Sequence, residues 1–289
     1  MTYGDVWRRL SVLYPEGEAK ALARMLLEEK FGMTLADILC GGVESLSADD
    51  TLWLERSVAR LECSEPIQYV LGWAWFCGLR FAVGEGVLIP RPETEWLVER
   101  VKALSADSMA ACGVNGAPAP RVLDIGTGSG CIAVSLKKAM PEAYVEAWDV
   151  SPAALAIASG NARSLGADVV FRERDALNEQ PSADKWDIIV SNPPYVCDSE
   201  RADMDSNVLD HEPATALFVP DADPLLFYRA ITRYAAQTLR PGGRLLFECN
   251  TRFAVDTARM MNDAGFGGTS VADDCFGKPR FAEGVLSVG

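Results

Sequence analysis

The stretch that decides the fold is RVLDIGTGSGCIAVSL, residues 121–136. Its first residues, Val122 to Ile125, form a strand pattern, glycines follow at positions 126, 128 and 130, and an apolar helical pattern begins directly after them. Because glycine has no Cβ, the backbone can turn sharply there and pass close to a ligand. Such a ligand also meets the free N–H groups of a helix N-terminus. We therefore expect a strand, a ligand-binding loop and a helix.

Strand and helix patterns alternate through the rest of the chain beyond this loop. Alternation of this kind indicates parallel strands with helices on both faces, so the sequence predicts a doubly wound, mostly parallel, Rossmann-like α/β sheet. We expect strands at 144–148, 168–171, 186–190 and 244–248, and helices at 225–239 and 252–264.

The region before the loop has a different character. Apolar residues recur at helical spacing near the N-terminus, and a second helix is expected over 49–61 with Ser47 or Asp49 as its cap. Residues 66–90 are rich in aromatic residues and glycine, which is typical of a β-hairpin between two domains. A helix at about 92–104 and an Ala-, Gly- and Pro-rich loop over 105–120 should follow. The predicted domains are a helical domain at 1–64, a hairpin linker at 65–90 and a catalytic domain at 91–289.

The composition restricts the possible partners. The net charge of −14 over 289 residues repels a polyanion, so nucleic acid is a poor candidate substrate. The chain has 8 cysteines without a C-x-x-C pair and a single histidine, His211, so we expect reduced thiols and no metal site. His211 lies in a predicted loop, and we assign it no catalytic role. Without an apolar run of about 18 residues or a signal-peptide pattern, the chain is expected to be soluble and not exported.

Two acidic residues follow strands that end near the glycine loop. Asp149 lies about 20 residues beyond the loop, where a carboxylate can accept both hydroxyls of a ribose. A dinucleotide fold uses a similar loop. The alternative role for Asp149 is to cap the next helix, which Ser151 can do as well. Asp175 is placed by topology to accept a hydrogen bond from an adenine amino group, with a plain surface turn as the alternative.

The strand at 186–190 runs into Ser191-Asn192-Pro193-Pro194-Tyr195. The two prolines fix the backbone and remove two N–H donors, so the loop offers rigid acceptors. The Asn192 side-chain oxygen and the Pro193 carbonyl can each accept one N–H of an NH₂ group, while Tyr195 stacks on the flat group that carries it. This arrangement suits methyl transfer from a sulfonium to a planar nitrogen, because positioning replaces a strong base. A proline-rich surface turn is the structural alternative.

These motifs together resemble the family of glutamine methyltransferases that modify peptide chain release factors. The resemblance covers almost the whole chain, and the acceptor tetrapeptide alone is shared with adenine-N6 DNA methyltransferases. Besides the two loops, it rests on Glu65-Pro66-Ile67-Gln68-Tyr69-Val70-Leu71-Gly72, Leu88-Ile89-Pro90-Arg91-Pro92-Glu93-Thr94-Glu95, Glu212-Pro213-Ala214-Thr215-Ala216-Leu217 and Asp274-x-x-Gly277-x-x-Arg280.

The resemblance implies a class I methyltransferase that uses S-adenosyl-L-methionine, with S-adenosyl-L-homocysteine as the product. The implied acceptor is the glutamine of the Gly-Gly-Gln loop of class 1 release factors, held in part by the helical N-terminal domain. The family implies a cytoplasmic monomer that binds neither nucleic acid nor membrane directly. The implied cofactor contacts are Gly126, Thr127, Gly128, Ser129, Gly130, Asp149, Asp175, Ala176 and Asn192. The implied glutamine site comprises Asn192, Pro193, Pro194 and Tyr195, walled by Arg91, Glu93 and Thr94, with Asn192, Pro193 and Tyr195 as catalytic residues.

Two positions depart from the family pattern. The family usually has a glycine within two residues of Glu248, where this chain has Cys249-Asn250, and asparagine also tolerates a positive φ. Ala176 stands where a bulkier residue would stack on adenine, which implies weaker cofactor affinity. Adenine-N6 methylation and a non-catalytic, cofactor-binding adaptor remain alternatives. The acidic charge opposes the first of them, and Asn192 opposes the second.

Overall fold

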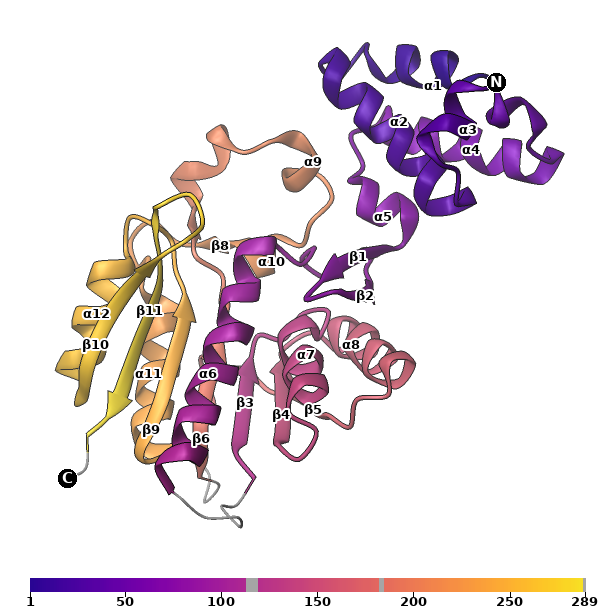
Figure 1. Ribbon diagram of the computed structural model, residues 1–289. Coiled ribbons are helices and arrows are strands. Elements are labelled where there is room, and N and C mark those ends of the chain that lie inside the picture. The colour runs from indigo at the N-terminus through magenta and orange to yellow at the C-terminus, as the bar shows by residue number, and fades with distance from the viewer. Residues whose placement is uncertain (113–118, 182–184, 288–289) are drawn as a thin grey trace. The chain divides into compact units, whose positions relative to one another are not determined.

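The computed structural model describes residues 1–112, 119–181 and 185–287. The chain forms two compact units (Figure 1). The first comprises Met1–Trp73 and Met204–His211, and the second comprises Ala74–Asp203 and Glu212–Gly289. The division into functional domains at residues 64 and 90 stays a prediction.

The first unit is helical. Its helices are α1 (Tyr3–Leu10), α2 (Glu16–Phe31), α3 (Leu35–Leu39), α4 (Ala48–Leu61), α5 (Ile67–Leu71) and α9 (Ser206–Leu209), with a 3-10 turn, η1 (Gly42–Ser45). Ser47 is the N-cap of α4, and its hydroxyl accepts from the backbone N–H of Asp50 at 3.1 Å. The apolar positions at helical spacing meet in one core, which includes Ala19, Ala23, Leu26, Leu27, Leu54, Val58 and Leu61.

Within the described residues, the second unit holds a sheet of seven strands in the order β10-β11-β9-β6-β3-β4-β5. The strands are β3 (Arg121–Ile125), β4 (Tyr144–Asp149), β5 (Val170–Glu173), β6 (Trp186–Ser191), β9 (Leu239–Glu248), β10 (Phe266–Asp273) and β11 (Pro279–Leu286). β5, β4, β3, β6 and β9 are parallel to one another, whereas β11 and β10 continue the sheet in antiparallel fashion beyond β9. The predicted mostly parallel α/β sheet is therefore confirmed.

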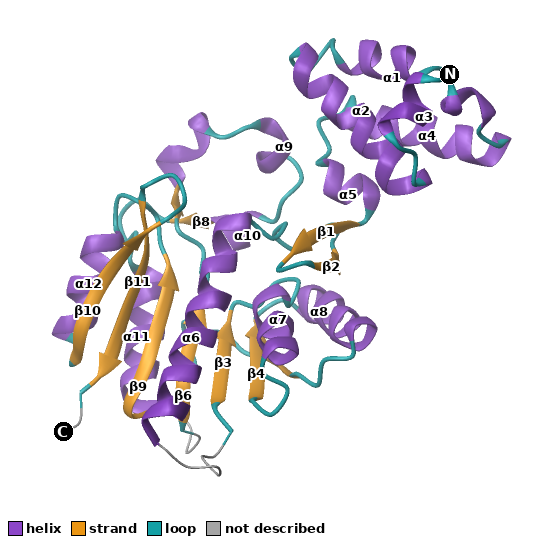
Figure 2. Cartoon of the chain, viewed as in Figure 1, coloured by secondary structure: helices purple, strands orange, loops and turns teal. Residues whose placement is uncertain are grey.

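Helices cover both faces of this sheet (Figure 2). The first face carries α6 (Glu95–Cys112), α7 (Cys131–Ala139) and α8 (Pro152–Leu165), and the second carries α11 (Leu226–Thr238) and α12 (Ala254–Asp263). Side chains alternate between the two faces along each strand. For example, Val122 belongs to the core with α6, α7 and α8, and Leu123 belongs to the core with α11 and α12. A strand buried on both sides reads as a continuous apolar run, as Ile188 to Val190 does.

The smaller elements of the second unit connect the sheet to its loops. A two-stranded sheet joins β1 (Trp73–Phe76) to β2 (Leu79–Ala82), and Cys77 and Gly78 turn between them with positive φ, as expected for a tight hairpin. The others are η2 (Pro92–Thr94), β7 (Val196–Cys197), η3 (Asp198–Asp203), α10 (Ala214–Leu217) and β8 (Phe218–Val219).

Some element limits differ from those predicted. The β-hairpin predicted over residues 66–90 was wrong at its start, because the helix α5 occupies Ile67–Leu71 and the two strands lie within residues 73–82. The predicted loop at 105–120 was wrong over its first part, because α6 continues to Cys112, and residues 113–118 lie outside the described residues. Alanines at 106, 110 and 111 favour helix, and their propensity extends α6 although Gly and Pro follow in the sequence. The last parallel strand begins at Leu239, five residues before the predicted start at Arg244.

The glycine loop yields a stability prediction. A Cβ on Gly130 would lie 3.0 Å from Ala158 Cβ and 3.2 Å from Ala158 Cα, whereas a Cβ on Gly128 would meet nothing within 4 Å. Both glycines have positive φ, so Gly130→Ala and Gly128→Ala share a backbone strain of about 1–2 kcal/mol. Gly130→Ala adds overpacking against α8, and it should lower the free energy of unfolding by about 1–3 kcal/mol more than Gly128→Ala. Urea unfolding without cofactor measures both, and equal losses would contradict the packing argument.

Candidate active site

The glycine loop connects the end of β3 to the start of α7. Gly126, Gly128 and Gly130 all have positive φ, and Gly130 is the N-cap of α7. The backbone N–H groups of Gly126 and Thr127 donate to the Trp148 carbonyl at 2.9 and 2.8 Å. The loop is thus fastened to the end of β4, which brings it beside Asp149.

Asp149 faces the glycine loop and does not cap α8. Its Oδ2 accepts from the Gly128 N–H and its Oδ1 from the Ser151 N–H, both at 2.9 Å. The Ser151 hydroxyl is the cap, because it accepts from the Ala154 N–H at 3.2 Å. The capping role that the sequence left open between these residues therefore belongs to Ser151. The Asp149 carboxylate keeps further lone pairs for a ligand.

Asp175 and Ala176 lie next along this edge of the sheet. The Arg174 N–H donates to the Asp149 carbonyl at 3.0 Å, which ties their turn to β4. The Asp175 oxygens accept from the Leu177 N–H at 2.9 Å and from the Asn178 amide at 2.6 Å. Ala176 packs against the core between the sheet and α11. The adenine contact predicted for this pair stays a prediction, since the Asp175 carboxylate already closes its own turn.

Asp124 is a buried acid under the glycine loop that the sequence reasoning missed as a site residue. Its Oδ2 accepts from the Thr127 hydroxyl at 2.6 Å, whereas its Oδ1 has no hydrogen-bond partner in the described part of the chain. Burial raises the pKa of Asp124 to about 7. Hydrogen bonds from the Thr127 hydroxyl and the Ala133 N–H act to lower this pKa, whereas the negative charge of Asp149 raises it further. An acid at the last-but-one position of a strand before a glycine loop was the available signal.

The acceptor loop begins directly beside the glycine loop. Ile125 pairs with Ser191 across β3 and β6, and the Ser191 hydroxyl donates to the Ile125 carbonyl at 2.6 Å. A Cβ on Gly126 would lie 4.0 Å from the Asn192 carbonyl oxygen. The structure thus brings the predicted cofactor loop and the predicted acceptor residue Asn192 together.

A chain of hydrogen bonds runs from Asn192 to a buried carboxylate. The Asn192 amide donates through Nδ2 to the Thr94 hydroxyl at 3.2 Å, and that hydroxyl donates to Glu248 Oε2 at 2.6 Å. The Tyr195 hydroxyl donates to the other oxygen, Oε1, at 3.1 Å. Burial raises the pKa of Glu248, while the two hydroxyl donors and the Arg280 guanidinium oppose the rise. Glu248 is a second residue that the sequence reasoning did not assign to the site.

Asn250 fastens the far side of the acceptor loop. The expectation that an asparagine replaces the family glycine at positive φ was wrong, because within the described residues the non-glycine residues with positive φ are Ser64 and Cys77. Instead the Asn250 amide donates to the Tyr195 carbonyl at 3.1 Å and to Glu200 Oε2 at 2.9 Å. The side chain that glycine lacks therefore holds the loop from outside.

Arg91, which we predicted to wall the glutamine site together with Glu93 and Thr94, is paired with Glu212. Arg91 Nη2 lies 2.5 Å from Glu212 Oε1, and the Ile89 N–H donates to Glu212 Oε2 at 3.0 Å. Glu93 is half-buried in η2 and raises the pKa of Glu248 by its charge. A small pocket lies here, lined by Leu88, Arg91, Asn192, Pro193, Tyr195, Val196, Ala216 and Leu217. The half-buried Pro194 is next to this lining in sequence.

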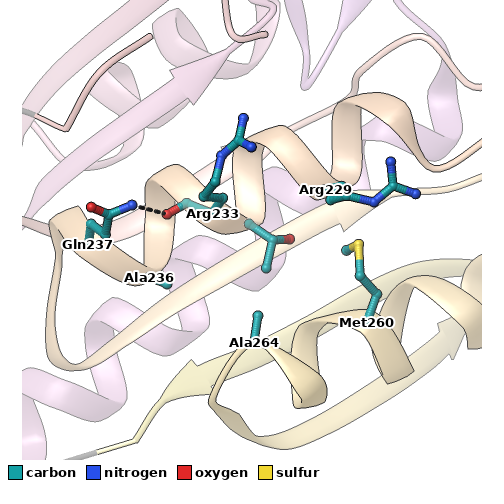
Figure 3. A pocket seen from close by; sticks show the side chains of 7 residues that line it. Arg229, Arg233, Ala236, Gln237, Met260 and Ala264 are labelled. Atoms are coloured by element: carbon teal, nitrogen blue, oxygen red, sulfur yellow. Dashed lines mark hydrogen bonds between the residues drawn. The ribbon is translucent and has the colours of Figure 1, made fainter. Parts of the chain in front are cut away.

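A larger depression of about 280 Å³ lies between α11 and α12 (Figure 3). Arg229 and Arg233 extend from α11, and Met260 and Ala264 face them from α12. Arg229 is paired with Asp223 at 2.8 Å. Because none of the predicted site residues lines this depression, we place the chemistry at the smaller pocket beside Asn192.

Several other expectations concern groups outside the pocket. His211 Nε2 lies 3.1 Å from the Cys63 carbonyl within the first unit, whereas the residues that line the pocket belong to the second unit. The cysteine side chains that the structure describes are free thiols, and its described residues contain no cluster of three metal-ligating side chains. A search of the described helices finds none with the length and apolar character needed to cross a bilayer.

The buried Asp124 carboxyl predicts a pH dependence of stability. The unfolded chain releases this proton above about pH 4, but the folded protein keeps it to about pH 7, so rising pH favours unfolding across this window. Between about pH 5 and pH 8, the unfolding free energy of the wild type should fall by roughly 3 kcal/mol relative to that of Asp124→Asn. Urea titrations along a pH series measure it. The exposed-site control Asp263→Asn should follow the wild type, and parallel curves for wild type and Asp124→Asn would refute the assignment.

Known proteins match both units. Residues 110–213 match the family model of the methyltransferase small domain, and residues 8–72 match that of the PrmC N-terminal domain. The release factor glutamine methyltransferase of Bacteroides thetaiotaomicron is 46% identical over 272 residues, or 94% of either chain. That of Flavobacterium psychrophilum is 40% identical over 273 residues, or 94% of this chain and 93% of the relative.

A solved structure supports the fold independently. A methyltransferase from Pyrococcus furiosus aligns with a TM-score of 0.51 and 15% identity, over 80% of this chain and 98% of that one. At this identity the likeness speaks for the fold alone. The relatives named above are similar over nearly their whole length, so the chain belongs to the family of release factor glutamine methyltransferases.

Proposed function

We propose that this chain transfers a methyl group from S-adenosylmethionine to the side-chain amide nitrogen of a glutamine in a peptide chain release factor. The observation that carries the proposal is Asn192, which lies beside the glycine loop at the end of β6 with its amide oriented by Thr94. Family membership supports the same acceptor. We further propose that the glutamine is that of the Gly-Gly-Gln loop of class 1 release factors.

The residues around the glycine loop fit S-adenosylmethionine. A Cβ on Gly128 would meet open space, so a ligand can approach the backbone closely there. Asp149 has lone pairs left for ribose hydroxyls, and Asp175 with Ala176 lies next along the same edge. Asp124 Oδ1 and Ser129 Oγ are buried polar atoms at this loop that have no hydrogen-bond partner in the part of the chain that the structure describes, which suits a ligand with polar and charged groups. Thr127 and Gly130 complete this loop. When bound, S-adenosylmethionine supplies an electrophilic methyl group.

The acceptor loop supplies recognition of a planar NH₂ group. With Nδ2 of Asn192 engaged by Thr94, its Oδ1 is left to accept one N–H of the glutamine amide. The Pro193 carbonyl accepts the second, because proline fixes the loop and offers no donor of its own. Tyr195 and Arg91 line the pocket, and we propose that the Tyr195 ring and Pro194 bound the flat face of the amide, with Arg91 and Glu93 as the wall.

These contacts define what the protein contributes to the reaction. An amide nitrogen is a poor nucleophile, since its lone pair is delocalised into the carbonyl. Two acceptors on its hydrogens stabilise positive charge as the N–C bond forms and the S–C bond breaks, and the nitrogen then releases a proton to water. Holding the two reacting atoms in line supplies the remaining rate. No strong base is needed beside the nitrogen.

The place of action follows from the substrate. We propose a cytoplasmic monomer that meets release factors directly, with the N-terminal residues 1–64 as the docking part. Neither nucleic acid nor a membrane is a required partner in this proposal. The net charge of −14 supports a protein substrate over a polyanion.

The acceptor can be identified directly. With labelled S-adenosylmethionine, a class 1 release factor should take up one methyl group per chain, and mass spectrometry should place it on the Gly-Gly-Gln glutamine. The same factor with that glutamine changed to alanine should remain unlabelled. Equal labelling of the alanine variant would assign another acceptor, and labelling of duplex DNA at moderate salt would revive the adenine alternative.

Asn192 should matter for catalysis more than for cofactor binding. Asn192→Ala removes one acceptor from the transition state, so kcat should fall about 10²- to 10³-fold, as it does when one stabilising polar group is removed elsewhere. The dissociation constant for S-adenosylmethionine, measured by calorimetry, should change far less. Asn262→Ala, at an exposed position of α12, is the control and should leave both quantities unchanged. Full activity of Asn192→Ala would move the catalytic role elsewhere.

A further inference from the structure

The amide of Asn192 has two ends that differ in chemistry but hardly in shape. Its oxygen accepts hydrogen bonds, whereas its nitrogen carries two donors. Only the oxygen can receive an N–H of a substrate amide, so a rotation of half a turn about the Cβ–Cγ axis would oppose donor to donor. Something in the protein must therefore select one orientation.

The Thr94 hydroxyl can make this selection because it has a single hydrogen. That hydrogen is directed at Glu248 Oε2 over 2.6 Å, and an ionised carboxylate can only accept. The Thr94 oxygen is then left with acceptor capacity alone, and the Asn192 Nδ2 donates to it at 3.2 Å. Rotating the Asn192 amide would place two oxygens together with no hydrogen between them. The chain of bonds thus has one direction, from Asn192 to Glu248.

Burial raises the pKa of Glu248, and the hydroxyl donors and the Arg280 guanidinium around it oppose that rise by favouring the ionised form, which can only accept hydrogen bonds. Glu248 is 1% exposed at the end of β9, and the Tyr195 hydroxyl donates to its second oxygen at 3.1 Å. The Arg280 guanidinium, whose Nε lies 3.4 Å from Asp274 Oδ2, adds a favourable charge interaction. Both carboxylate oxygens therefore have donors, and each donor belongs to a different part of the pocket wall.

We propose that Glu248 is a positioning residue for methyl transfer, which acts through the Thr94 hydroxyl to turn the Asn192 oxygen toward the substrate amide. The same carboxylate fixes the Tyr195 ring through its hydroxyl. This inference rests on the proposed function, because it explains how the acceptor of that reaction is oriented. Glu248 itself need not touch the substrate.

Thr94→Val tests the relay, since it keeps the shape of the side chain and removes the hydroxyl. We expect kcat to fall about tenfold or more. The dissociation constant for S-adenosylmethionine should stay within about twofold of the wild type. Thr94→Ser, which restores the hydroxyl, should recover most of the activity. Thr238→Val is the matched control, because Thr238 is also buried and its hydroxyl donates to the Tyr234 carbonyl at 2.9 Å.

A double-mutant cycle tests whether Glu248 acts through Thr94. Glu248→Gln replaces a carboxylate, which only accepts when ionised, with an amide that has one accepting oxygen and one donating NH₂ group, so the direction of the relay is no longer imposed. Its effect on kcat should largely overlap with that of Thr94→Val in the double variant. Fully additive losses would overturn the relay. The relay would also be overturned if Thr94→Ser were as impaired as Thr94→Val. The same holds if the substitutions weakened cofactor binding and left kcat unchanged.

A readout without catalysis separates this inference from the proposed function. The side-chain ¹⁵N–H₂ resonances of Asn192, assigned through Asn192→Ala, should shift in Thr94→Val and in Glu248→Gln but stay in place in Thr238→Val. If the wild type fails to methylate a release factor while these shifts occur, the proposed substrate is wrong and the relay stands. Unchanged resonances in Thr94→Val would overturn the relay whatever the activity.

Discussion

The site depends on the pairing of β3 with β6 in one register. Ile125 lies opposite Ser191, and the Ser191 hydroxyl closes the pair by donating to the Ile125 carbonyl at 2.6 Å. Because the strands are parallel, the residues that follow them, Gly126 and Asn192, start side by side. A shift of one residue would turn every side chain of β6 to the opposite face and carry Asn192 away from the loop. Both strands are buried on both faces, so the apolar core fixes this register.

Two buried carboxylates at this edge have opposite surroundings. Glu248 has a hydroxyl donor on each oxygen and Arg280 nearby, so its hydrogen-bonding capacity is met inside the protein. Asp124 accepts from the Thr127 hydroxyl through Oδ2, while the described residues give its Oδ1 no hydrogen-bond partner. Burial and the charge of Asp149 raise its pKa to about 7. The first is suited to hold other side chains in place. The second has an oxygen below the glycine loop for which the described part of the chain provides no hydrogen-bond partner.

The sequence was sufficient to predict what depends on local pattern. Alternating strands and helices, the turn at Gly126 to Gly130 and the rigid Asn192 loop all follow from periodicity and backbone chemistry. It could not predict the bond from Thr94 to Glu248, whose residues are 154 positions apart and meet only through the fold. The helix cap at Ser151 and the contacts of Asn250 with the acceptor loop also became clear only from the structure. Several polar groups lie near each of these residues, and the sequence does not say which of them it binds. The end of α6 was predicted too early, because the Gly and Pro that follow favour a loop while the alanines before them favour helix.

The charges around the pocket bear on which NH₂ group it can accept. A flat amino group on adenine and a glutamine amide offer the same two hydrogens to Asn192 and Pro193, so the acceptor loop alone does not choose between them. A nucleic acid would need cations for its phosphates. The two arginines next to the acceptor residues are already engaged, Arg91 with Glu212 at 2.5 Å and Arg280 with Asp274 at 3.4 Å. With its nearby cations neutralised and a net charge of −14, this pocket favours an uncharged amide carried on a protein.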